Sequence, residues 1–243
     1  MFRLETQTPL AAGPEGFPRR AGQAYLPGAV LREALLAAAL AYAIRRDEAF
    51  AAEMRRMAQH AFKGSAGELA AAMVAALLER QPELEALAPA DVPLPETVRR
   101  RVLVLDTVAA GAPKELELEL FEGRAVVPDP LRPELETWLA TATHGFQSAL
   151  ARVEATLLVP LLPETEPLYR RLAARERSGS FWPLRVGYWT PDPEGARFLA
   201  FTDLVAAERA LERRFRTRPF PRWVVYDPKS RRTLGWLTLE KEG

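Results

Sequence analysis

Strand-like and helix-like segments alternate along this chain, and their order constrains the fold more than any other feature. Residues 2–10, FRLETQTPL, alternate as a first strand does, with Phe2, Leu4 and Thr6 on one face. From Gly28 the apolar residues form a helical stripe, and residues 222–240 predict a hairpin with its turn at 227–230. Strands that bracket helices in this order indicate an α+β sandwich.

The segments between these ends predict further helices and strands. Helices are expected at 47–60 and 68–80, over 133–158 with an interruption near Gly145, and at 202–215. Strands are expected at 99–107, at 114–123 as its partner, and at 183–190. Residues 11–23, AAGPEGFPRRAGQ, and the proline-punctuated residues 82–96 are expected to form surface connections.

The composition is that of a globular protein and excludes several kinds of site. Of 243 residues, 48% are hydrophobic and 27% charged, which is enough to bury a core. No apolar run reaches the ~18–20 residues that span a bilayer. The first residues also lack the layout of a secretory signal, so a cytoplasmic protein without membrane contact is expected. The absence of cysteine excludes disulfides and thiolate zinc sites, and the absence of asparagine with abundant proline indicates a thermophile or a GC-rich genome.

Arginine is concentrated in a few stretches, although the net charge is only +1. These stretches are 99–101, 169–177 and 213–222. A nearly neutral chain can still present one strongly positive face to a nucleic acid. The alternative interpretation is that each stretch is a solvated face of a helix or strand.

No residues form a recognisable catalytic or metal-binding group. His60 and His144 lie in helical stretches without a titratable partner at a telling spacing, which favours structural or surface roles. Glu115, Glu117 and Glu119 fall on one face of a strand, as an exposed sheet face does. We therefore expect no catalytic residue, no metal and no cofactor.

Pro27 and Gly28 stand directly before the long helical stripe and suggest a phosphate-binding site. The N–H groups at a helix N-terminus carry partial positive charge, and glycine lets a phosphate approach the backbone. Side chains close in sequence that could add charged or polar contacts are Arg19, Arg20, Gln23 and Arg32. The alternative interpretation is a tight turn into a helix without a ligand.

A second candidate stretch is RTRPFPRW, residues 216–223. Arginines interleaved with aromatic rings are typical of contacts to single-stranded nucleic acid, in which guanidinium groups bind phosphates and rings stack on bases. The candidate phosphate-binding residues here are Arg216, Arg218 and Arg222.

These segments together resemble the RAMP proteins of CRISPR effector complexes. Members open with a strand ending near Thr-Pro, a glycine-bearing loop and a Pro-Gly pair before the first helix, and LETQTPLAAG and AYLPGAVLREALL follow that order. The matching residues are Pro27, Gly28, Leu31, Ala34 and Leu35, with Arg32 in place of a lysine. The stretches VLVLDT, PLRVGYW and the closing RRTLGWLTLE look most like the fifth Csm subunit of type III-A complexes.

The resemblance implies a modified ferredoxin-like (RRM-like) α+β fold with helical insertions, built as a single RAMP unit over residues 1–243. Residues 1–127 would form the core with a helical insertion at about 46–90. Residues 128–180 would form a helical segment, and residues 181–243 an α+β part that completes the core.

The function implied by the resemblance is antiviral defence. The chain would be a non-catalytic, structural crRNA-binding subunit that caps the effector filament near the 3′ part of the crRNA. Its partners would be the crRNA, the backbone RAMP subunit and the small helical subunit, with target RNA contacted indirectly. Because Ala29 and Val30 lack the hydroxyls usual after Pro-Gly, RNA contact would rely on the Pro27–Ala29 backbone and on arginine.

Two other functions remain open from the sequence. The chain could be a RAMP-type endoribonuclease that processes guide RNA with His60 or His144 as base, although residues 11–26 contain no aspartate, only Glu15. It could also be an adaptor that binds only protein, with its arginines facing acidic subunits.

Overall fold

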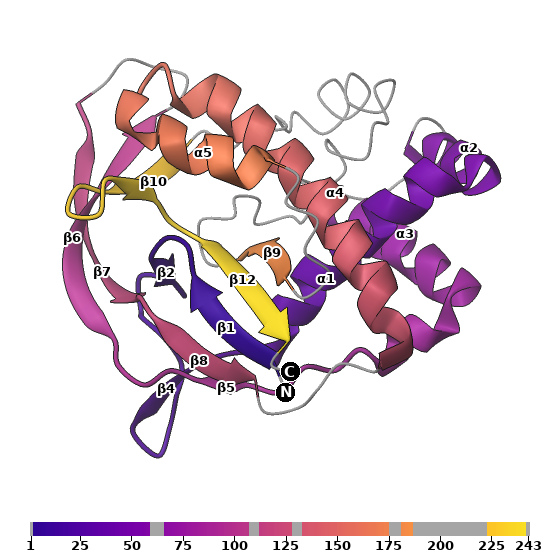
Figure 1. Cartoon of the computed structure of the whole chain (residues 1–243), viewed down its shortest axis with the longest axis horizontal. Coiled ribbons are helices and arrows are strands. Elements are labelled where there is room, and N and C mark those ends of the chain that lie inside the picture. Colours follow the sequence, from indigo (N-terminus) through magenta and orange to yellow (C-terminus); the bar gives the residue numbers. More distant parts are fainter. Residues whose placement is uncertain are drawn as a thin grey trace.

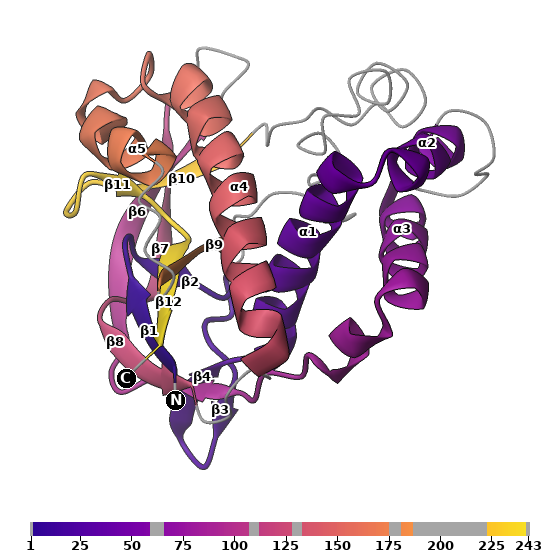
Figure 2. The same cartoon turned by 45° about the vertical axis from the view of Figure 1, so that its right-hand side comes forward.

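The computed structural model describes residues 2–58, 66–106, 112–127, 133–174, 181–186 and 223–241. Antiparallel sheets form one side of this part of the molecule, and the long helices α1 (Gly28–Arg46) and α4 (Pro133–Leu158) lie against them (Figures 1 and 2). The mixed α+β class expected from the sequence is confirmed. Within the described residues, no helix is both long enough and apolar enough to cross a membrane.

The first sheet has four strands in the order β8-β1-β12-β9, all antiparallel to their neighbours. Their bounds are β1 Phe2–Thr6, β8 Arg124–Val127, β9 Phe181–Arg185 and β12 Trp236–Lys241. The first and last strands form the central pair, with Phe2 opposite Lys241 and Leu4 opposite Leu239. Phe2 and Leu4 are buried against the helices, as the two-residue period predicts.

The second sheet has five strands in the order β11-β10-β6-β7-β2. Their bounds are β2 Leu10–Ala11, β6 Val98–Asp106, β7 Lys114–Phe121, β10 Trp223–Asp227 and β11 Arg232–Thr233. The expected pairing of the two central segments is confirmed, with Val102 opposite Leu116. The chain passes between the two sheets after β1, β7 and β11, and Gly123 (φ 139°) and Gly235 (φ 98°) lie at the last two corners.

Residues 11–23, expected as a loop, contain half of a hairpin. Strand β3 (Arg19–Arg20) pairs with β4 (Gln23–Leu26) around a turn in which Ala21 and Gly22 have positive φ, and β4 pairs with β5 (Val92–Pro93). The expected surface connection at 82–96 therefore contributes a strand to this third sheet. Its remaining part includes the short 3₁₀ helix η2 (Pro82–Ala86).

Three shorter helices complete the described part. They are α2 (Glu48–Arg56), α3 (Ala66–Arg80) and α5 (Glu166–Ala173), the last preceded by the 3₁₀ turn η3 (Pro163–Thr165). Helix α4 is continuous through Gly145, so the expected interruption is wrong. Buried Phe146 and Leu150 of α4 pack with Ala38 and Ala41 of α1, and this packing outweighs the ~1 kcal/mol that glycine costs in a helix.

A buried ion pair joins the helices to the corner between the sheets. Arg185 on β9 donates from Nε to Glu154 on α4 at 3.1 Å, and its Nη1 donates to the Leu234 carbonyl. Tyr169 on α5 donates to Glu154 at 3.1 Å and lies 2.8 Å from the Thr233 hydroxyl. Burial, followed by the charge of Glu154, raises the pKa of Tyr169 well above its ordinary value, so its phenol remains a donor.

The order of strands in the first sheet bears on the finer fold prediction. Among the described residues, this sheet receives one strand between α1 and α4 and two strands after α4. The ferredoxin-like order places two strands between the helices and one after the second helix. The modified ferredoxin-like subclass and the proposed division of residues 1–243 therefore stay predictions, and the expected helix at 202–215 lies outside the described residues.

Candidate nucleic-acid interface

The N-terminus of α1 is closed by a carboxylate from another part of the chain. Pro27 occupies the N-cap position, and the Gly28 amide donates to Oδ1 of Asp91 at 3.0 Å. Because an acidic side chain interacts favourably with the positive end of a helix, Asp91 occupies the position that a phosphate would take. A phosphate that bound the Gly28 amide would have to displace Asp91.

Glycine is needed at position 28 for a packing reason that the sequence does not reveal. A Cβ at this position would overlap the carbonyl oxygen of Pro89 and lie 2.9 Å from the carbonyl carbon of Ala90. The backbone of residues 89–91 thus crosses directly over the start of α1. Gly28 is buried, Pro27 is half-buried and Ala29 is exposed.

Two of the candidate arginines project from the β3–β4 hairpin, which extends from the lower edge of the molecule in Figure 2. Arg19 pairs with Glu119 and donates to the Gly22 carbonyl at 2.9 Å. Arg20 pairs with Asp91 at 3.1 Å, and its guanidinium lies over the Tyr25 ring at 5.3 Å. The two side chains are still 50% and 75% exposed, so both guanidinium groups remain accessible to a phosphate.

Of the remaining candidate residues, two lie at this corner and three lie outside the described residues. Gln23 is exposed on β4, and Arg32 is half-buried because its Nε donates to the Leu87 carbonyl at 2.8 Å. Asp91 links Arg20 to Gly28, so the structure brings the hairpin and the start of α1 together. Arg216, Arg218 and Arg222 lie outside the described residues, and the binding role of the whole set stays a prediction.

Glu119 and Asp91 contact the candidate binding residues, and the sequence did not predict either contact. Glu119 was expected on an exposed face with Glu115 and Glu117, but it is buried because the 16–19 segment covers it. Burial alone would raise the pKa of Glu119, but hydrogen bonds from Thr97 and the Phe17 amide and the charge of Arg19 hold this pKa below its ordinary value. The alternation of residues in a strand does not indicate that a distant loop will cover one of its faces.

The corner has the chemistry of a binding surface. It presents guanidinium groups, backbone and an amide side chain. The described residues contain no group of three His, Asp or Glu able to hold a metal. His144 lies half-buried near the middle of α4, and His60 lies outside the described residues.

Comparison with known proteins gives a sequence relative and a solved structure with a similar fold. No family model matches the sequence. A relative from Aquifex aeolicus (strain VF5), described as an uncharacterized protein, is 26% identical over 245 residues and spans 99% of this chain and 100% of the relative. The structure is similar to a chain in a cryo-EM structure of a Csm–crRNA–target RNA ternary complex of a type III-A CRISPR-Cas system, with a TM-score of 0.57 and 17% identity. The similarity covers 92% of this chain and 74% of that chain, and it shows a shared fold.

Proposed function

We propose that this chain is a non-catalytic, crRNA-binding structural subunit of a type III-A CRISPR effector complex, most like the fifth Csm subunit. The observation that carries the proposal is the fold similarity, across 92% of the chain, to a component of a Csm–crRNA–target RNA complex. The stretches that resemble the family lie in or begin in β1, the start of α1, β6, β9 and the β11–β12 segment.

The RNA-binding surface in this proposal is the corner formed by the β3–β4 hairpin and the start of α1. Arg19 and Arg20 would bind phosphates through their exposed guanidinium groups. The Gly28 amide would join them only where a phosphate replaces the Asp91 carboxylate. Arg216, Arg218 and Arg222 would add a second set of phosphate contacts.

The salt dependence of RNA binding tests the second set of contacts. For single strands, log K falls by about 0.7 per phosphate contact per unit of log salt concentration. Replacing Arg218 and Arg222 together by alanine should flatten the slope by about 1.4, measured by fluorescence anisotropy with labelled single-stranded RNA. The matched control replaces Arg101 and Arg124, which are exposed on the sheets and paired with Glu115 and Glu5. An unchanged slope in the first variant would remove Arg218 and Arg222 from the site.

The position in the complex is tested by assembly. Co-expression with a backbone RAMP subunit, a small helical subunit and crRNA should recover this chain in the ribonucleoprotein, and crosslinks should map it to the 3′ part of the crRNA. Recovery of a complex that excludes the chain would contradict the proposal.

The absence of catalysis is tested with labelled repeat RNA. The purified chain should leave this RNA intact. Cleavage that disappears in His60→Ala or His144→Ala would establish the endoribonuclease alternative instead.

A further inference from the structure

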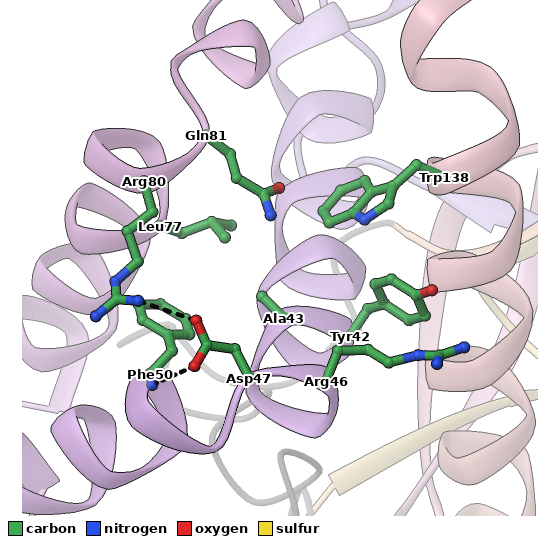
Figure 3. Close-up of a pocket in the computed structure, with 9 residues that line it drawn as sticks. All are labelled: Tyr42, Ala43, Arg46, Asp47, Phe50, Leu77, Arg80, Gln81 and Trp138. Atoms are coloured by element: carbon green, nitrogen blue, oxygen red, sulfur yellow. Dashed lines mark hydrogen bonds and ion pairs between the residues drawn. The ribbon is translucent and has the colours of Figure 1, made fainter.

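A second surface with the chemistry of nucleic-acid recognition lies away from the hairpin corner. A pocket of about 330 Å³ opens where the C-terminal part of α1 meets α3, the start of α2 and α4 (Figure 3). Its lining residues are Tyr42, Ala43, Arg46, Asp47, Phe50, Leu77, Arg80, Gln81 and Trp138. This volume is within the range of small-ligand sites.

Aromatic side chains form one wall of the pocket. Trp138 of α4 and Tyr42 of α1 meet edge to face, with their ring centroids 5.4 Å apart, and both are half-buried. In Figure 3 the Gln81 amide and the Trp138 ring point towards one another across the pocket. Gln81 makes no side-chain hydrogen bond within the described part of the chain, so its amide is available to a ligand. The pocket therefore offers a ring face and, opposite it, a donor and an acceptor.

Two arginines at the rim differ in what they already bind. Arg80 is held by Asp47 and Glu53, each at 2.9 Å, and lies 5.0 Å from the centroid of the Phe50 ring. Arg46 is exposed and lies 5.3 Å from the centroid of the Tyr42 ring, and among the described residues it has no carboxylate partner. Arg80 thus fixes one wall, and Arg46 has a positive charge available to an anion.

We propose that this pocket binds one unpaired nucleobase of a single-stranded RNA. The base stacks on Trp138, the Gln81 amide hydrogen-bonds to the edge of the base, and Arg46 binds the adjoining phosphate. Stacking on an aromatic ring with an arginine beside the backbone is the usual way in which proteins hold single-stranded bases. The inference rests on the proposed RNA-binding function, but it concerns different residues from the hairpin corner.

Charge and polarity favour RNA over a protein segment as the occupant. An apolar peptide anchor would leave the Gln81 amide and the Arg46 guanidinium without partners in its contact surface, and unpaired polar groups weaken binding. A nucleotide satisfies both groups because it combines a flat ring, polar edges and a phosphate. The test must therefore distinguish RNA from a segment of a neighbouring protein as the occupant of the pocket.

The test measures the affinity of the full chain for a short fluorescein-labelled single-stranded RNA at low salt. Trp138→Leu should weaken binding by about 5-fold or more while leaving the salt slope unchanged, because a stacked base is lost and no phosphate contact is lost. Arg46→Gln should lower the slope by about 0.7. The matched controls are Thr137→Ala, an exposed residue beside Trp138, and Arg152→Gln, an exposed arginine 14 positions further along α4.

A second measurement needs no substitution. RNA that carries 4-thiouridine is photo-crosslinked to the unaltered chain, and the modified peptides are identified by mass spectrometry. We expect crosslinks on the peptides that contain Trp138 or Tyr42. This measurement remains decisive if circular dichroism shows that Trp138→Leu does not fold.

The outcomes distinguish failure of the pocket proposal from failure of the proposed RNA-binding function. If the unaltered chain binds RNA, but Trp138→Leu binds equally well and no crosslink maps to the pocket, the pocket proposal is wrong and the proposed function stands. If Trp138→Leu keeps its RNA affinity but loses assembly with a Csm subunit, the occupant is a protein segment and the proposal is likewise overturned. If the unaltered chain binds no RNA even at low salt, the RNA-binding function fails and this ligand fails with it.

Discussion

Gly28 illustrates how one backbone position can be fixed by a neighbour far along the chain. Because a Cβ there would overlap the backbone of Pro89, Gly28→Ala should destabilise the protein by about 1–3 kcal/mol, as overpacking does. Gly145→Ala is the matched control, since its Cβ would find Arg45 Nη1 as nearest neighbour at 3.9 Å. That substitution should be neutral or stabilising. Denaturant unfolding measures both, and equal stability of the two variants would contradict the close packing at Gly28.

Asp91 occupies the start of α1, where the proposed function places an RNA phosphate, so its removal should have two opposite effects. Asp91→Ala should lower the free energy of unfolding by about 1 kcal/mol, because the Gly28 amide loses its partner at the helix N-terminus. The same change should raise RNA affinity, since it frees both that amide and Arg20. Glu115→Ala is the control, because it removes an equal charge from an exposed pair with Arg101. An RNA affinity no higher than that of the control would show that phosphate does not reach this corner.

The residues at this corner were only partly predictable. The position of Pro27 and Gly28 before a long helix followed from turn chemistry and from the helical stripe. The partners Asp91 and Glu119 come from segments 63 and 100 residues away from Gly28 and Arg19. No local pattern encodes such contacts, because they depend on how distant segments pack.

The junction of α4 and α5 with the sheet corner depends on the buried pair of Arg185 and Glu154, whose side chains are 6% and 1% exposed. Arg185→Met should destabilise the protein by about 3–5 kcal/mol, because Glu154 is left as an uncompensated buried charge. Adding Glu154→Met should restore part of that loss, and thermal or urea unfolding of the two single variants and the double variant measures the coupling. A double variant no more stable than Arg185→Met would show that the buried charge is not the main cost.

Elements with strong local signals were predicted better than those built by distant contacts. The start of α1 and the β6–β7 pair follow from periodicity and turn residues, and the structure confirms both. The sequence did not predict that α4 continues through Gly145. Packing against α1 stabilises the helix there, and this stabilisation offsets the low helix propensity of glycine. Strand β3 was missed because two residues in a glycine- and proline-rich stretch carry no alternation.

The class of the whole molecule was predictable from the order of its segments, whereas its strand pairing was not. Strands at both ends with helices between them indicate an α+β protein, but the sequence does not say that β1 pairs with β12 across more than 230 residues. The resemblance to RAMP proteins implied only that residues 181–243 complete the core formed by residues 1–127. The fold similarity to a Csm complex component is consistent with it.

The central position of β12 predicts the effect of removing it. A chain ending at Gly235 should show no cooperative thermal transition by circular dichroism, because the buried Trp236, Leu237 and Leu239 are lost from between β1 and β9. Lys241→Ala is the control, since it removes only an exposed side chain paired with Glu136 and should change stability by no more than about 0.5 kcal/mol. A sharp transition in the shortened chain would mean that the first sheet forms without its central pair.

The pairing of β1 with β12 also determines when the first sheet can fold during synthesis of the chain. While the ribosome is still producing residues before 236, β1 has no partner on its β12 side, and the hydrogen-bonding groups of that edge stay unpaired. Folding of this sheet must then wait until nearly all of the described chain has been translated, a delay that exposes newborn molecules to chaperones. Any contact of a larger particle with this completed sheet would accordingly follow the synthesis of β12.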